Sequence, residues 1–185
     1  SGVVHFAFTF HLPVFFVASG YFFKPEQVLD GRFFSKSWCT ILLPYLVTCL
    51  FIVAGCVAVA FFQGGSMRQA AVTWTGASLY GAGASSPMTL FPVVRIGGIW
   101  FLMALLWAQI VVIVTARFPK PWLWVVGLFV LGWASARYVM LPWDIQPGLC
   151  AALYVYAGTL ARKRALFERD GRATAVIFAL CLLVW

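Results

Sequence analysis

Long apolar stretches, separated by connections that carry most of the charge, constrain this 185-residue chain more than any other feature. The stretches occupy residues 3–23, 38–62, 97–116, 121–138, 145–160 and 173–185. The first five approach or exceed the roughly 20 residues that a helix needs to cross the hydrocarbon core of a bilayer. Charged residues make up 10% of the chain, whereas a typical soluble domain contains about a quarter. The sequence therefore predicts an all-α, polytopic transmembrane helix bundle with about six spans.

The ends of the chain predict that it is a fragment. Residue 1 is a serine directly before an apolar stretch, and the last stretch stops after 13 residues at Trp185. The start lacks the basic segment and the small-residue cleavage site of a signal peptide. We therefore expect residues 1–185 to be a single membrane domain, truncated at both ends, with an extracytoplasmic loop at about residues 63–96. Within this loop, residues 70–79 form either a short interfacial helix or part of a plain tether.

The basic residues predict the orientation, because short loops rich in Lys and Arg stay on the cytoplasmic side of a membrane. These residues are concentrated after the first, third and fifth stretches and are sparse in the loops between them. The first stretch should therefore run from outside to inside. The formal net charge of +8 follows from this topology and from attraction to anionic lipid, so we expect membrane lipid as a partner and no nucleic acid.

A histidine and a proline interrupt the first apolar stretch at His11 and Pro13. An ionisable group inside a span is expensive to desolvate, so by default it is a functional-site hypothesis. Pro13 removes a backbone donor and is expected to kink the helix, which would let water reach His11. An unperturbed histidine has a pKa of about 6.5, so His11 could act as a general base toward a hydroxyl group. The alternative is a neutral imidazole that packs between helices.

The other candidates in this stretch are weaker. His5 lies about 240° around an ideal helix from His11, so the two histidines do not share a face. Ser19 is eight residues from His11, which is about 12 Å along a helix, so a serine–histidine pair is excluded. Ser19 and Gly20 are instead interpreted as small residues that permit a close approach of helices.

The positions of the acidic residues and the spacing of the cysteines argue against several kinds of functional site. All five acidic residues lie in predicted loops or at a span boundary, which leaves His5 and His11 as the ionisable groups inside the predicted spans. Transport by intramembrane carboxylates and hydrolysis by a carboxylate pair are therefore not indicated. The five cysteines form no C-x-x-C pair, so neither a metal site nor a disulfide is predicted. No cofactor is expected.

Four segments together resemble a known family. The run His-x-Pro-x-Phe-Phe-x-x-Ser-Gly-Tyr, from His11 to Tyr21, is similar to the second-span signature of the integral-membrane acyltransferase 3 family, closest to its fucose 4-O-acetylase-like branch. Three further segments follow in the order that the family shows: Phe34-Ser35-Lys36 with Leu42-Leu43-Pro44-Tyr45, Ile99-Trp100-Phe101-Leu102, and Pro142-Trp143-Asp144-Ile145 with Tyr156-Ala157-Gly158.

The resemblance implies an O-acyltransferase that moves an acyl group, acetyl in the first instance, from acyl-CoA to a hydroxyl of a cell-envelope carbohydrate or lipid-linked sugar. It implies a multi-pass protein of the cell membrane, by family the bacterial inner membrane. His11 is the catalytic candidate, although the family's best-supported histidine lies in a preceding span. Arg32 and Lys36, four residues apart, are candidates to bind the phosphates of acyl-CoA. Arg95 and Trp100 are candidates to bind the acceptor.

Two other functions stay open. The chain could be a transporter or sensor-type membrane domain that binds a small molecule near His11 without catalysis. A purely structural subunit is a third interpretation, but it leaves His11 unexplained.

Overall fold

The computed structural model is all-helical in the part of the chain that it describes, which confirms the predicted class. It describes residues 2–24, 33, 35, 37–81, 94, 96–138 and 141–164, and for residues 2–11 the backbone alone. Six α-helices and two short helical turns occur there: α1 (Gly2–Phe22), η1 (Trp38–Leu42), α3 (Leu43–Phe62), α4 (Met67–Tyr80), α5 (Trp100–Thr115), α6 (Pro121–Ser135), η2 (Pro142–Asp144) and α7 (Ile145–Lys163).

The helices coincide with the first five predicted stretches to within a few residues, and the sixth, 173–185, lies outside the described residues. The π-helical turn η1 runs directly into α3, so that Trp38–Phe62 forms one helix of 25 residues, long and apolar enough to cross a membrane. Leu12–Phe22, Trp100–Thr115 and Pro121–Ser135 are shorter apolar helices. The described part of the chain thus contains one helix that is capable of spanning a membrane, and the count of about six spans stays a prediction.

Two prolines lie within helices. α1 continues through Pro13 as one helix, so this residue does not end it. Pro44 lies in the first turn of α3, where the backbone changes from the π-helical turn to an α-helix. A proline has no amide to donate, and the π-helical turn that precedes it accommodates this missing hydrogen bond. The irregularity therefore lies at the start of α3.

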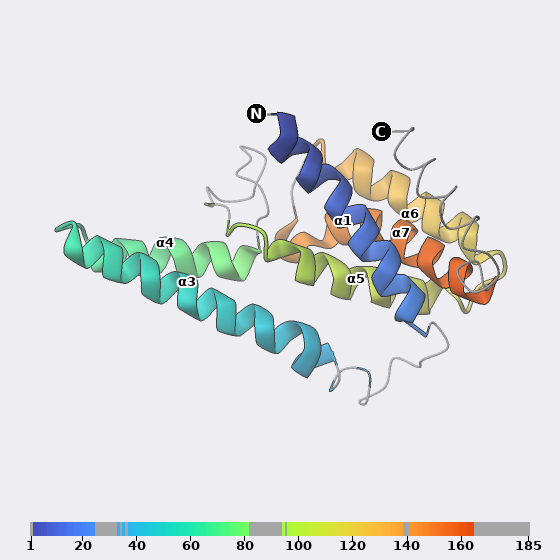
Figure 1. Cartoon of the computed structure of the whole chain (residues 1–185), viewed down its shortest axis with the longest axis horizontal. Coiled ribbons are helices and arrows are strands. Elements are labelled where there is room, and N and C mark those ends of the chain that lie inside the picture. Colours follow the sequence, from blue (N-terminus) through green and yellow to red (C-terminus); the bar gives the residue numbers. More distant parts are fainter. Residues whose placement is uncertain are drawn as a thin grey trace.

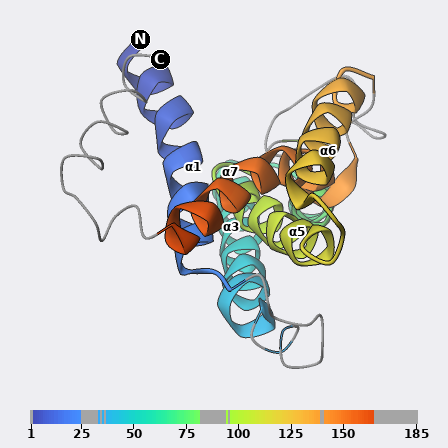
Figure 2. The same cartoon turned by 90° about the vertical axis from the view of Figure 1, so that its right-hand side faces the viewer.

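Helix α7 is the centre of the bundle and packs against α1, α5 and α6. Figure 2 shows α7 between α1 on one side and α5 and α6 on the other. Most of its buried residues are small, and Ala104 and Ala108 of α5 belong to the same core cluster as Ala151 and Ala152 of α7. Because small side chains let helix axes approach, the bundle is held by close backbone packing. The fully buried members of this core are Ala104, Ala108, Val112, Ala152 and Val155.

Glycines make the contact between α1 and α7. A Cβ atom added to Gly20 would overlap the carbonyl oxygen of Val155, and one added to Gly158 would overlap the carbonyl oxygen of Val17. The two helices therefore touch backbone to backbone, as the small-residue pattern at the end of α1 predicted.

Helices α3 and α4 form an antiparallel pair, the α3–α4 arm, which extends away from the other helices (Figure 1). The turn is closed by a hydrogen bond from the Gly65 amide to the carbonyl of Ala60, 2.8 Å long. The hydroxyl of Ser66 caps α4 by accepting from the Gln69 amide. A helix within the predicted loop is thus confirmed, and it is longer than predicted and packs lengthwise against α3.

Candidate functional site

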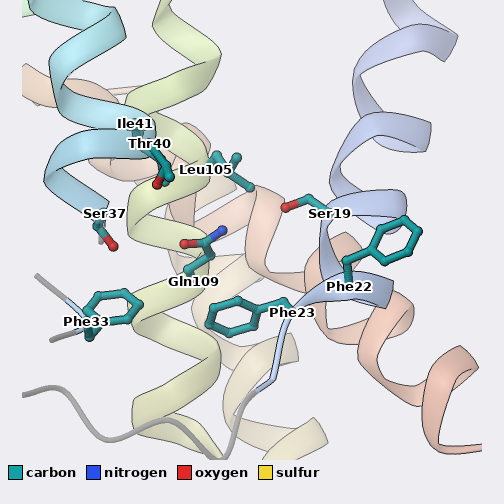
Figure 3. A pocket seen from close by; sticks show the side chains of 9 residues that line it. All are labelled: Ser19, Phe22, Phe23, Phe33, Ser37, Thr40, Ile41, Leu105 and Gln109. Atoms are coloured by element: carbon teal, nitrogen blue, oxygen red, sulfur yellow. The ribbon is translucent and has the colours of Figure 1, made fainter. Parts of the chain in front are cut away.

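A cavity of about 340 Å³ lies between the last turns of α1, the turn η1 and the middle of α5 (Figure 3). Its size is within the range of pockets that hold small ligands. Aromatic and aliphatic side chains make most of its wall, and four polar side chains interrupt it. The lining residues are Ser19, Phe22, Phe23, Phe33, Ser37, Thr40, Ile41, Leu105 and Gln109.

The polar groups of the cavity are neutral. In Figure 3 the amide of Gln109 on α5 and the hydroxyl of Ser19 on α1 face the same space from two helices. Ser37 and Thr40 add hydroxyl groups from the start of η1. An amide offers both donors and an acceptor, and a hydroxyl offers one of each kind. These described lining residues can therefore orient a carbonyl, an amide or a thioester between apolar walls, but they contain no acid or base.

Of the site residues named from the sequence, the structure describes the side chain of Trp100 alone. His11 lies on α1, eight residues before Ser19 and hence about 12 Å along the helix. The side chain of His11, and all of Arg32, Lys36 and Arg95, lie outside the described residues. Trp100 is half-buried at the start of α5, where it packs against the core cluster and does not line the cavity.

A second polar site joins the α3–α4 arm to the rest of the molecule, and we call it the polar corner: Tyr45, Ser78, Leu79, Gly81, Trp143 and Asp144. The Tyr45 hydroxyl donates to the carbonyl of Ser78 at 2.7 Å. The Trp143 indole donates from Nε1 to the carbonyl of Leu79, also at 2.7 Å. These bonds tie α3 to α4 and α4 to the turn η2.

Asp144 places a carboxyl group inside this corner. Its side chain is 3% exposed, and a Cβ atom on Gly81 would lie 3.3 Å from Asp144 Oδ2 and 3.4 Å from the Tyr45 hydroxyl. Asp144 does lie at the start of a predicted span, as expected. What the sequence did not show is that the Asp144 side chain is buried there, because the backbone turns it inward.

The backbone at this corner is strained. Trp143 and Asp144 have φ values of 62° and 51°, in the left-handed region that side chains with a Cβ atom avoid. A residue held there costs of order 1–3 kcal/mol, and such residues cluster at functional sites. The surrounding contacts must offset that cost. They include the indole hydrogen bond of Trp143 and a neighbouring network around Gln146.

Gln146 connects the end of α6 to the start of α7. It is 2% exposed, accepts from the Leu141 amide at 2.7 Å through Oε1, and donates to Ser135 Oγ at 3.3 Å through Nε2. A buried amide satisfied on both sides restricts the positions of the groups that it joins. Gln146 therefore helps to fix the turn that carries Trp143 and Asp144.

Sequence reasoning missed Gln109 and misjudged Ser19. Gln109 had a signal, since it is the one amide side chain within the apolar helix 100–115. Ser19 was assigned to packing, but in the structure its neighbour Gly20 makes the helix contact and Ser19 lines the cavity. Asp144 had no comparable signal, because its inward direction depends on two left-handed residues.

The family model of the acyltransferase domain matches this chain over residues 1–185, which is its whole length. The chain belongs to the acyltransferase 3 family. This assignment makes it a member of a membrane-associated acyltransferase family. No curated protein and no solved structure matches this acyltransferase 3 chain significantly. The fucose 4-O-acetylase-like branch therefore stays a prediction.

Proposed function

We propose that this acyltransferase 3 domain is a multi-pass membrane O-acyltransferase that transfers an acyl group, acetyl in the first instance, from acyl-CoA to a hydroxyl of a cell-envelope carbohydrate or lipid-linked sugar. The family match over residues 1–185 carries this proposal. A cavity with apolar walls and neutral hydrogen-bonding groups supports it, because an acyl thioester combines an apolar chain with a carbonyl acceptor.

The topology supports entry of the donor from the cytoplasm. If α1 runs from outside to inside, its last turn and the exposed Lys24 lie at the cytoplasmic face. The cavity lies between this end of α1 and η1, and two of its lining residues, Phe33 and Ser37, directly follow Arg32 and Lys36 in sequence. We propose that Arg32 and Lys36 bind the phosphates of acyl-CoA while the thioester end enters the cavity.

Within the cavity, each lining group has a distinct role. Gln109 and Ser19 would donate hydrogen bonds to the thioester carbonyl, and the apolar contacts of Phe23, Ile41 and Leu105 would hold the acyl chain. Donors aimed at that oxygen also stabilise the negative charge that develops when the carbonyl is attacked. The cavity thus supplies binding and polarisation, and the base must come from outside its described lining.

The transfer needs one proton acceptor. The acceptor's hydroxyl oxygen attacks the thioester carbon, a new C–O bond forms, the C–S bond breaks, and coenzyme A leaves as the thiol after it takes up the proton. We propose that His11 accepts the proton from the hydroxyl and returns it to the leaving sulfur, since histidine side chains can both accept and donate a proton near neutral pH. Arg95 and Trp100 are proposed to contact the acceptor.

Transfer of labelled acetyl from acetyl-CoA to envelope glycan, in membranes that contain the full-length protein, tests this function. We expect labelling with wild type and a loss of at least about a hundredfold with His11→Ala, the size typical of losing a general base. Ser66→Ala on the α3–α4 arm is a control that should retain labelling. If wild type labels glycan no more than empty membranes do, the proposal is wrong.

A non-catalytic binding domain is the second candidate, and the neutral lining of the cavity favours it. Such a domain would bind acyl-CoA without releasing thiol. Equilibrium binding of labelled acetyl-CoA, measured beside thiol release, separates the two: binding without any release identifies a sensor or transporter, and release that depends on the acceptor identifies the enzyme.

A further inference from the structure

The lining of the cavity changes in character along its length. One end is aromatic, the middle is polar and the other end is mainly aliphatic, and we call these the aromatic end, the polar level and the aliphatic end. In Figure 3 they are formed by Phe23 and Phe33, then by Gln109, Ser19 and Ser37, and then by Ile41 and Leu105, with Thr40 beside Ile41. A ligand that lies along the cavity therefore meets three environments in a fixed order.

The course of the two wall elements η1 and α5 explains this order. On α5, Leu105 precedes Gln109 by four residues, so the two side chains share a face and lie about 6 Å apart along the helix. On the opposite wall, Ser37 precedes Ile41 by four residues at the start of η1. Since α5 and η1 run in opposite directions (Figure 3), both walls place the polar residue at one level and the aliphatic residue at the next.

The aliphatic end is closed by the core of the bundle. Ile41 and Leu105 are 5% and 6% exposed, and they belong to one core cluster with Phe16 of α1. The last turn of α1 differs, because Phe22 of the lining is 80% exposed there and the exposed Lys24 follows it. A ligand that enters from this end of α1 therefore reaches Ile41 and Leu105 last.

The separation of the polar level from the aliphatic end limits what fits between them. Along α5 this separation is one helical turn, or about 6 Å. An extended chain with carbon–carbon bonds of about 1.5 Å advances about 1.3 Å per bond, so this length takes up about four bonds. A longer chain would have to displace Ile41 or Leu105 from the core, which is unfavourable because close-packed interiors contain little free volume.

We propose that Ile41 and Leu105 set the longest acyl chain that the donor site accepts, at about four carbons. This assignment rests on the proposed function, in which the cavity binds the thioester end of acyl-CoA. The thioester carbonyl lies at the polar level, where Gln109 and Ser19 donate hydrogen bonds to it, and the acyl chain extends toward the aliphatic end. Each methylene that fits there leaves water and stabilises the complex. Ile41 and Leu105 thus determine specificity and take no part in the bond changes of the transfer.

Equilibrium binding tests the chain-length limit without reference to transfer. The Kd values of acetyl-, butyryl-, hexanoyl- and octanoyl-CoA are measured by competition with labelled acetyl-CoA, on full-length protein in lipid nanodiscs, with free ligand concentrations determined directly. We expect the affinity to rise about fourfold for each methylene from acetyl to butyryl. Octanoyl-CoA should bind at least about tenfold more weakly than butyryl-CoA, because it overfills the aliphatic end. Octanoyl-CoA that binds as tightly as butyryl-CoA would overturn the limit.

Leu105→Ala tests the assignment to a residue. This change enlarges the aliphatic end, so we expect hexanoyl-CoA to gain at least about tenfold in affinity relative to butyryl-CoA. Leu106→Ala is the matched control, because Leu106 is the next residue of α5 and packs against the same core cluster without lining the cavity. The control should keep the wild-type order of affinities. An unchanged order in Leu105→Ala, or the same change in both variants, would overturn the role of Leu105.

Two substitutions of Ile41 keep the proposal testable if Leu105→Ala does not fold. Ile41→Val removes one methyl group and should improve hexanoyl-CoA relative to butyryl-CoA by about fourfold. Ile41→Phe adds bulk and should weaken butyryl-CoA relative to acetyl-CoA by at least about tenfold. A merely structural role of Ile41 would weaken all four ligands alike, and that result would contradict the assignment.

The chain-length limit and the proposed function can fail separately. If wild type transfers acetyl and the order of affinities is the same in wild type, Leu105→Ala and Ile41→Phe, the function stands and the limit is wrong. If wild type binds the ligands in the expected order and never transfers an acyl group, the limit stands for a binding domain. If no acyl-CoA binds to wild type, the donor site and the limit are both wrong.

Discussion

The cavity and the polar corner are both polar places in an apolar molecule, yet they are built in opposite ways. The cavity has an open volume and neutral groups on three separate elements, and α1 and α5, which contribute Ser19 and Gln109, both pack against α7. The polar corner is filled, contains a carboxyl group and needs two left-handed residues. The cavity therefore suits a ligand that enters and leaves, whereas the corner suits a fixed arrangement around one charged group. Four substitutions test that difference.

The largest effect is expected at the contact between α1 and α7, because the end of α1 forms one wall of the cavity. Gly158→Val would push a side chain into the carbonyl of Val17, and α1 would have to move away from α7. We expect a loss of about 3 kcal/mol or more in the free energy of unfolding, or no folded protein at all. Thermal unfolding in detergent measures this. Gly127→Val is the control, because nothing lies within 4 Å of that position, and equal stability of the two variants would contradict the backbone contact.

The second largest loss of stability is expected from a substitution of the glycine in the polar corner. Gly81 has a φ of 76°, and a Cβ atom there would lie 3.3 Å from Asp144 Oδ2. We expect Gly81→Ala to lower the free energy of unfolding by about 2 kcal/mol, because a left-handed residue with a side chain is strained. Acetyl-CoA binding, measured by titration, should stay unchanged. Loss of donor binding in a folded variant would show that the two regions are not independent.

Filling the cavity should act mainly on donor binding. Leu105→Trp adds bulk to the α5 wall, so we expect the Kd for acetyl-CoA to rise about tenfold, which corresponds to about 1.4 kcal/mol. Because Leu105 is buried, the unfolding temperature should also fall, but by less than in Gly158→Val. The control is Leu131→Trp, on the exposed face of α6. Unaltered acetyl-CoA binding by the Leu105 variant would place the donor elsewhere.

The smallest effect is expected from one hydrogen bond of the corner. Trp143→Phe keeps an aromatic ring and removes the donor to the Leu79 carbonyl. Removal of a single hydrogen bond should cost about 1 kcal/mol of unfolding free energy. Trp122→Phe, an exposed indole at the start of α6, serves as the control in the same thermal measurement. A shift no larger than that of the control would mean that Trp143 does not fasten α4.

The helices were predictable because their signal is local. Apolar stretches of suitable length predicted α1, α3, α5, α6 and α7, and the resemblance in four segments predicted the family that the family model confirms. The contact at Gly20 was also foreseeable, since small residues at a helix surface invite a close partner. The continuation of α1 through Pro13 as one helix was not, because a proline inside a helix usually ends or kinks it.

The sequence by itself determined the all-helical class and the membrane environment, because both follow from the length and the polarity of local stretches. Tertiary structure alone decided that α4 lies lengthwise on α3, that Ser19 and Gln109 share a cavity, and that Asp144 turns inward beside Tyr45. The physical reason is that these features depend on contacts between residues far apart in the chain. Hydropathy assigns a segment to lipid or to water, but close packing and buried hydrogen bonds determine which polar groups meet inside the bundle.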